Sequence, residues 1–172
     1  MMIRGIFVHT HPERGFEPNA MSSALRAAAQ GDRVLVAQCL KGGIGQGPTG
    51  KLRFVERLEW MRPDIARVID SGASEAERLA FNALWHEIKD KLKDLDTLVL
   101  DEPGLAIEFG LLDERQLVDL LASKPASLQI WITGPGVPES VEPLADTWTF
   151  TRSRAAAPHA TGTLSSTTSS AA

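Results

Sequence analysis

Short apolar runs rich in β-branched residues alternate with longer stretches of helical periodicity along most of this chain. The runs predict strands at residues 3–10, 33–38, 97–100, 128–133 and 147–151, and most of the stretches between them predict helices. Strands that alternate with helices usually pair in parallel, because each helix carries the chain back across the sheet. We therefore expect an α/β domain with a mostly parallel central sheet.

The expected helices differ in how clearly their ends are marked. Residues 19–30 form a predicted helix closed by Gly31. The most regular helix spans residues 74–93, begins with capping-box spacing and carries an apolar stripe at one-turn intervals. Further helical pieces are expected after Asp113 and at residues 139–145.

Three segments between these elements are assigned differently. Residues 41–50 hold five glycines and a proline and predict a loop. Residues 58–61 predict a short strand, although Phe54 and Val55 before them would also suit a bent helix. The stretch between Glu102 and Asp113 predicts a loop.

Length and composition indicate one domain with a tail. The chain of 172 residues, 43% hydrophobic, matches the usual size of a single core. We assign residues 1–152 to that domain. Residues 153–172 are rich in Ala, Ser and Thr and predict a disordered tail, because they offer too little apolar surface to offset the entropy of ordering.

Charge and cysteine content limit the partners and the compartment. A net charge of −4 and an isoelectric point near 5.6 give no overall positive field for nucleic acid. The sequence contains no apolar run long enough for a membrane span and no secretory signal pattern. The single cysteine, Cys39, cannot form an internal disulfide and suits a reducing compartment. We expect a cytoplasmic protein without nucleic-acid or membrane partners.

Two carboxylates follow the apolar strand at residues 97–100. Asp101 and Glu102 stand at its carboxyl end, where open α/β sheets place their ligand crevice. A carboxylate there can hold Mg²⁺ beside nucleotide phosphates, as a Walker B strand does. Alternatively, the pair merely caps the next segment.

The connection between the first strand and the first helix has the position of a phosphate-binding loop but lacks its chemistry. Such loops need glycines, a lysine and a hydroxyl at a helix N-terminus. Residues 10–18 contain one glycine and no lysine, and Glu13 and Glu17 would repel a triphosphate. Arg14 is the one cation that can compensate in part.

Six short motifs occur in one order along the chain and together carry a resemblance. They are Ala-Leu-Arg-Ala at 24–27, Gln-Cys-Leu-Lys-Gly at 38–42, Leu-Val-Leu-Asp-Glu at 98–102, Phe-Gly-Leu-Leu-Asp at 109–113, Trp-Ile-Thr-Gly at 131–134 and Leu-Ala-Asp at 144–146. In these motifs the chain resembles the ATP:corrinoid adenosyltransferase family of the BtuR, CobO and CobP type. Residues 43–48 resemble a cyanobacterial branch of that family, in which the phosphate-binding loop is also degenerate.

The resemblance implies a P-loop NTPase-like three-layer α/β/α fold and a reaction in cobalamin biosynthesis. In that reaction Co(I) of a reduced corrinoid attacks the 5′ carbon of ATP and expels triphosphate. ATP, Mg²⁺ and a corrinoid are the implied ligands, and a homodimer is the implied assembly. The implied metal ligands are Asp101 and Glu102. The implied nucleotide-binding residues are Thr10, Arg14, Gly15, Lys41, Gly42, Thr133 and Gly134.

Departures from the family pattern are concentrated in the phosphate-binding loop. Phe16 stands in the place of the phosphate-binding lysine, Glu17 in that of the metal-binding threonine, and Pro135 in that of an arginine. The resemblance therefore predicts a corrinoid adenosyltransferase-like protein with weakened or lost catalysis, and no catalytic residue is assigned. A non-catalytic binding or regulatory module for a corrinoid, nucleotide or protein is the alternative. A different phosphate-loop ATPase or phosphotransferase fits less well.

Other candidate residues have structural interpretations that we favour. His9 and His11 could begin a metal site, but no third ligand with suitable spacing follows. Cys39 reads as a buried inert thiol. Lys41 suits either phosphate binding or a solvated loop. The tryptophans read as packing residues rather than corrinoid-stacking ones; they are Trp60, Trp85, Trp131 and Trp148.

Overall fold

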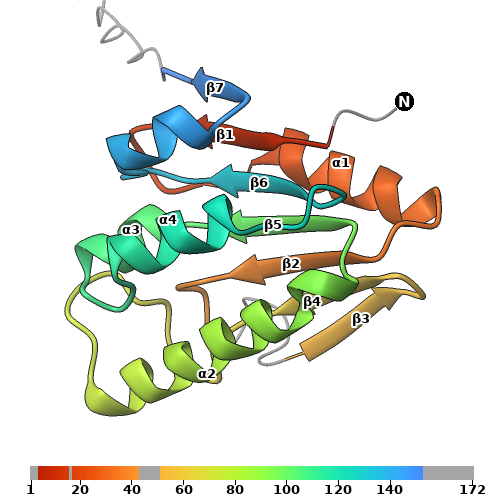
Figure 1. Ribbon diagram of the computed structural model, residues 1–172. Coiled ribbons are helices and arrows are strands. Elements are labelled where there is room, and N and C mark those ends of the chain that lie inside the picture. Colours follow the sequence, from red (N-terminus) through yellow and green to blue (C-terminus); the bar gives the residue numbers. More distant parts are fainter. Residues whose placement is uncertain (1–3, 16, 43–50, 153–172) are drawn as a thin grey trace, which may run out of the picture.

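The computed structural model describes residues 4–15, 17–42 and 51–152, apart from the side chains of 51–55, and within these ranges seven strands form one sheet (Figure 1). The strand order is β3-β4-β2-β5-β6-β1-β7. All neighbouring strands are parallel except β3 and β4, which form an antiparallel hairpin at one edge. The strands are β1 (Ile6–Thr10), β2 (Val34–Gln38), β3 (Lys51–Val55), β4 (Leu58–Met61), β5 (Thr97–Asp101), β6 (Gln129–Thr133) and β7 (Thr147–Phe150).

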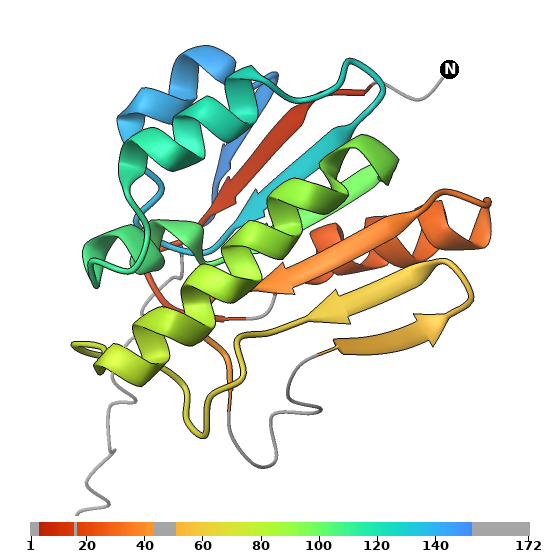
Figure 2. The same ribbon diagram turned by 60° about the horizontal axis from the view of Figure 1, so that its bottom comes forward.

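Helices cover the two faces of the sheet unequally (Figures 1 and 2). Helix α1 (Pro18–Ala29) packs on β2, β4 and β5 from one side. The other side carries most of the described helices and the larger core. These helices are α2 (Glu75–Lys91), η1 (Leu92–Asp94), α3 (Pro103–Glu108), α4 (Glu114–Ala122) and η2 (Glu139–Leu144). The result is the three-layer α/β/α arrangement expected from the sequence.

Burial along the strands explains why their sequences differ in pattern. All five residues of β2 and all five of β5 are buried, because both strands lie inside the sheet and have packed side chains on both faces. In β1 buried and half-buried residues alternate. Helix α2 begins with the expected capping box, in which Ser74 and Glu77 each bond the other's backbone.

Most predicted elements are confirmed, including the short strand at residues 58–61, which is β4. Strand β3 before it was not predicted; the two form a hairpin, so the bent-helix alternative was wrong. The stretch after Glu102 contains helix α3 rather than only loop, with Pro103 at its first position, where its missing N–H breaks no helical bond. Residues 43–50 of the loop predicted at 41–50 and the whole predicted tail at 153–172 lie outside the described residues.

Parallel pairing brings the carboxyl ends of several strands to one edge of the sheet. Strand β5 pairs with β2 on one side and β6 on the other, and β6 pairs in turn with β1. The segments that follow these strands therefore meet at this edge, and the candidate site lies there. No helix of the described part of the chain is long and apolar enough to cross a membrane.

Candidate functional site

Asp101 is the centre of a buried hydrogen-bond network at this edge. Its side chain, 1% exposed, accepts bonds from residues of two neighbouring strands. Thr133 Oγ1 donates to Oδ1 at 2.8 Å, and Gln38 Nε2 donates to Oδ2 at 2.9 Å. Lys41 Nζ lies 2.6 Å from the same Oδ2 and neutralises the carboxylate. Two residues implied by the resemblance, Lys41 and Thr133, thus meet a third, Asp101.

Glu102, which is fully buried, forms a second ion pair beside the first. Arg14 donates from Nε to Oε1 at 2.9 Å and from Nη2 to Oε2 at 2.5 Å, a two-pronged pairing. Its third nitrogen, Nη1, donates to the carbonyl of Ile69 at 2.8 Å. The hydrogen bond with Glu102 raises the pKa of Arg14 above its ordinary value. Residue 14, which follows β1, therefore reaches the acidic end of β5 across the width of β6.

Two of the implied nucleotide-binding glycines allow close backbone packing around this cluster. Gly134 has φ +100°, and a Cβ there would lie 3.0 Å from Glu102 Cγ. Glu102 itself has φ 62°, an uncommon conformation for a residue with a side chain. A Cβ on Gly42 would lie 2.5 Å from the Ile65 carbonyl oxygen. Close packing accounts for both glycines in this structure.

The N-terminus of α1, where a phosphate-loop protein would bind phosphate, holds the chain's own carboxylate. Glu17 is the N-cap, and its Oε1 accepts a bond from the Asn19 N–H at 3.2 Å. Pro18 follows and has no N–H to offer. His9 Nδ1 lies 3.9 Å from the same oxygen. The anion-binding end of this helix is therefore occupied, and Phe16 lies outside the described residues.

A cleft of about 560 Å³ opens beside the two ion pairs. It is lined by Arg14, Gly15, Gln38, Lys41, Trp60, Arg62, Val68 and Glu102. Thr10, the remaining implied residue, is buried, and its carbonyl accepts the Thr151 N–H at 2.8 Å, so the structure does not place it among the lining residues. The cleft gathers three cationic side chains and one carboxylate.

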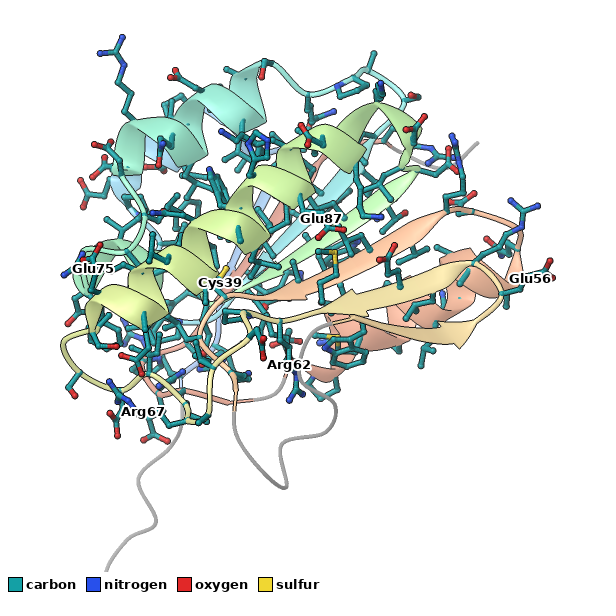
Figure 3. The ribbon with its side chains drawn as sticks, turned by 90° about the horizontal axis from the view of Figure 1, so that it is seen from below. Cys39, Glu56, Arg62, Arg67, Glu75 and Glu87 are labelled. Carbon is teal, nitrogen blue, oxygen red and sulfur yellow. The ribbon has the colours of Figure 1, made fainter. Side chains whose placement is uncertain are left out.

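Sequence reasoning missed Trp60 and Arg62 as members of this cleft. Trp60 Nε1 donates to Gln38 Oε1 at 3.0 Å, so the indole also fixes the network around Asp101. Arg62 follows β4 directly, at the opposite end of that strand from Glu56 (Figure 3). Because β4 is parallel to β2, its last residues lie at the edge that carries Gln38. A firm assignment of 58–61 as a parallel strand would have indicated this position.

The acidic pair does not fit Mg²⁺ in this arrangement. All four carboxylate oxygens of Asp101 and Glu102 accept hydrogen bonds from protein donors, and two cationic side chains contact them. A divalent ion would have to displace Lys41 or Arg14 and face the charge of the other. Within the described ranges no three His, Cys, Asp or Glu side chains group as metal ligands.

The two histidines, the cysteine and Trp85 lie beside neighbouring residues or in the core. The His9 ring lies 5.1 Å from the Trp131 ring, and His11 lies near Gly15. Cys39 is fully buried, and burial raises the pKa of its thiol far above the ordinary value. Trp85 belongs to the larger core, as expected.

The fold and this strand-end cluster define an α/β protein of the phosphate-loop type. The family model of the ATP:corrinoid adenosyltransferases BtuR/CobO/CobP matches residues 4–162, and the chain belongs to that family. The corrinoid adenosyltransferase CobA of Salmonella typhimurium is 30% identical over 146 residues, 83% of this chain and 73% of the relative. A corrinoid adenosyltransferase of Pseudomonas aeruginosa is 28% identical over 85% of the chain and 74% of the relative. An uncharacterised Nostoc protein is 26% identical over 78% of the chain and 39% of its own length.

Proposed function

We propose that this protein is a corrinoid adenosyltransferase-like protein whose adenosyl transfer is strongly weakened or lost. Its ligands are a corrinoid and ATP, as the family description and the relatives' names suggest. The observation that carries the proposal is the Glu17 carboxylate at the N-terminus of α1, because it fills the place where this type of fold holds phosphate.

The chemistry of the leaving group supports this proposal. Transfer of the adenosyl group expels triphosphate, whose charge the protein must stabilise. Loss of one preorganised donor at a developing charge typically costs about 3 kcal/mol of barrier, a factor of roughly 100 or more in rate. Here the sequence lacks both the lysine and the hydroxyl of the loop, while Glu17 adds a negative charge.

The hydrogen bonding of the Asp101 and Glu102 carboxylates favours a second candidate function, a non-catalytic binding module. Asp101 and Glu102 are fully hydrogen-bonded by protein groups, which suits a static role better than metal-assisted transfer. The cleft beside them still offers polar and cationic groups to a ligand. In this reading the protein binds a corrinoid, a nucleotide or a protein without turnover.

An anaerobic assay with chemically reduced cobalamin tests the proposal. Loss of Co(I) absorbance is followed after addition of MgATP, with the Salmonella typhimurium relative measured in parallel. We expect a rate at least about 100-fold below that of the relative. An equal rate would contradict weakened catalysis. Calorimetric titration with cobalamin and with MgATP separates the two candidates, since binding without turnover supports the module.

Restoring the loop chemistry sharpens the test. The double substitution Phe16→Lys with Glu17→Thr removes the capping carboxylate and supplies the missing cation and hydroxyl. We expect tighter ATP binding by calorimetry, because the freed N–H groups and the new ammonium can contact phosphate. Glu13→Thr, at an exposed position of the same loop, is the control and should leave ATP affinity unchanged.

A further inference from the structure

Arg62 differs from the other cations of the cleft because no carboxylate holds it. Two of its side-chain nitrogens, Nε and Nη1, are shielded from solvent and find no hydrogen-bond acceptor among the residues that the structure describes. Arg14 and Lys41 are both held by carboxylates at 2.9 Å or less. Buried donors on a charged group are costly to leave unpaired, by about 1–3 kcal/mol or more. An anion that accepted hydrogen bonds from the Arg62 guanidinium would remove this cost.

The electrostatic surroundings of Arg62 agree with this view. Burial lowers its pKa, which means that the site disfavours the charged form in the absence of a partner. The negative charge of Asp101 opposes this effect, but its oxygens accept their hydrogen bonds from Gln38, Lys41 and Thr133 rather than from Arg62. An anion in the cleft would supply both the missing charge and the missing acceptors.

Several cations line the same cleft as Arg62, and together they outnumber its acidic groups. Arg14 and Lys41 lie on its wall, and Glu102, the one lining carboxylate, is already paired with Arg14. Gln38 and the Trp60 ring complete the polar and aromatic lining. Planar guanidinium groups suit phosphate oxygens because they donate two parallel hydrogen bonds.

We propose that this cleft is a phosphate-binding subsite in which Arg62, supported by Lys41 and Arg14, holds a polyphosphate chain without a divalent metal. The subsite lies at the ends of β2, β4 and β5, and it does not use the capped N-terminus of α1. Lys41 and Arg14 already neutralise Asp101 and Glu102, so these carboxylates do not repel a phosphate chain in the cleft. The inference rests on the proposed function in one respect, the choice of a nucleotide polyphosphate as the natural ligand.

Inorganic tripolyphosphate is the probe that tests the subsite directly. Calorimetric titration of the full chain in EDTA should show binding, and Arg62→Gln should weaken it about tenfold or more, since hydrogen bonds to charged groups are the strong ones. Arg57→Gln removes the same charge from the exposed turn before β4, at the other end of that strand, and should leave the affinity unchanged. Far-UV circular dichroism of both variants checks that they fold.

Three further measurements complete the test. Arg62→Lys should retain part of the affinity, because it keeps the charge and loses the planar fork. Excess Mg²⁺ should leave tripolyphosphate binding unchanged or weaken it. ATP should compete with tripolyphosphate, whereas adenosine should not, if the phosphate chain is what the cleft recognises.

The inference is overturned if the wild type does not bind tripolyphosphate in EDTA, if binding requires Mg²⁺, or if Arg62→Gln and Arg57→Gln behave alike. Its failure is distinguishable from failure of the proposed function. Full adenosyl transfer would contradict the proposed function and leave a positive tripolyphosphate result standing. Absence of tripolyphosphate binding with slow or absent transfer would overturn only the subsite.

Discussion

The carboxyl ends of β1 and β5 lie at the same edge of the sheet, but the residues that follow them differ in how their charges are balanced. After β1, the N-terminus of α1 is capped by the carboxylate of Glu17. After β5, the acidic residues Asp101 and Glu102 are present but are paired with Lys41 and Arg14. The helix after β1 thus begins with a carboxylate, whereas the carboxylates after β5 are neutralised by cations. The same fold can thus place opposite charges at neighbouring strand ends, so function must be argued from the side chains at each end.

Breaking the buried pair at the end of β5 should have the largest effect on stability. Arg14→Ala leaves the fully buried Glu102 without its partner and should lower the free energy of unfolding by about 3 kcal/mol in urea denaturation. The double variant Arg14→Ala with Glu102→Gln should lose less than the sum of the single variants, because the unpaired charge is gone. Arg115→Ala, at a side chain 88% exposed, is the control. Equal losses for Arg14→Ala and Arg115→Ala would contradict the comparison.

Removing the cap at the end of the β1 connection should have a smaller effect. Glu17→Ala deletes one N-cap bond and should lower the free energy of unfolding by about 1 kcal/mol. The same variant exposes the helix N-terminus and should raise ATP affinity if the cap is what excludes phosphate. Glu13→Ala, at an exposed position nearby, should change neither quantity. A loss as large as that of Arg14→Ala would show that the two ends are equally important for stability.

The smallest expected effect comes from the opposite end of β5 and depends on pH. The Asp96 carboxylate accepts the Arg33 backbone N–H at 2.9 Å, and this bond is the main reason that its pKa is lowered. A lowered folded-state pKa stabilises the protein above the unfolded value of about 3.9, and this contribution is lost as the pH falls through the folded value. Asp96→Asn should therefore destabilise the protein near pH 6 by less than Glu17→Ala does, and the difference from wild type should shrink below about pH 4.

Urea midpoints of Asp96→Asn and wild type at several pH values measure this effect. Asp94→Asn, at an exposed carboxylate two residues earlier, serves as the control. A constant difference across the whole pH range would show that the charge of Asp96 is not what matters. That outcome would separate the hydrogen bond from the ionisation.

The sequence predicted the centre of the sheet well because its inner strands β2 and β5 are buried throughout. The continuous apolar runs of β2 and β5 and the capping box of α2 are local signals that survive folding unchanged. Strand β3 was missed because it is an edge strand after a glycine-rich stretch, and α3 because it is only six residues long.

The sequence predicted which residues lie at the candidate site but not which ion pairs they form. Strand order at one edge explains why Lys41, Asp101 and Thr133 meet, and the family motifs already pointed to them. The partner of Glu102 could not be inferred, because Arg14 lies 88 residues away in the chain. Arg62 carries no local motif, and only three-dimensional packing shows that two of its buried nitrogens lack an acceptor within the described part of the chain.

The position of β5 inside the sheet has a consequence for how a ligand would be detected. Backbone amides of a fully buried central strand exchange their hydrogens with solvent mainly when the whole domain opens. At its end, hydrogen bonds from Gln38, Lys41 and Thr133 already hold the Asp101 carboxylate. Occupation of the cleft should therefore raise the thermal unfolding midpoint of the entire domain and slow hydrogen exchange of the β5 amides by the same linkage factor.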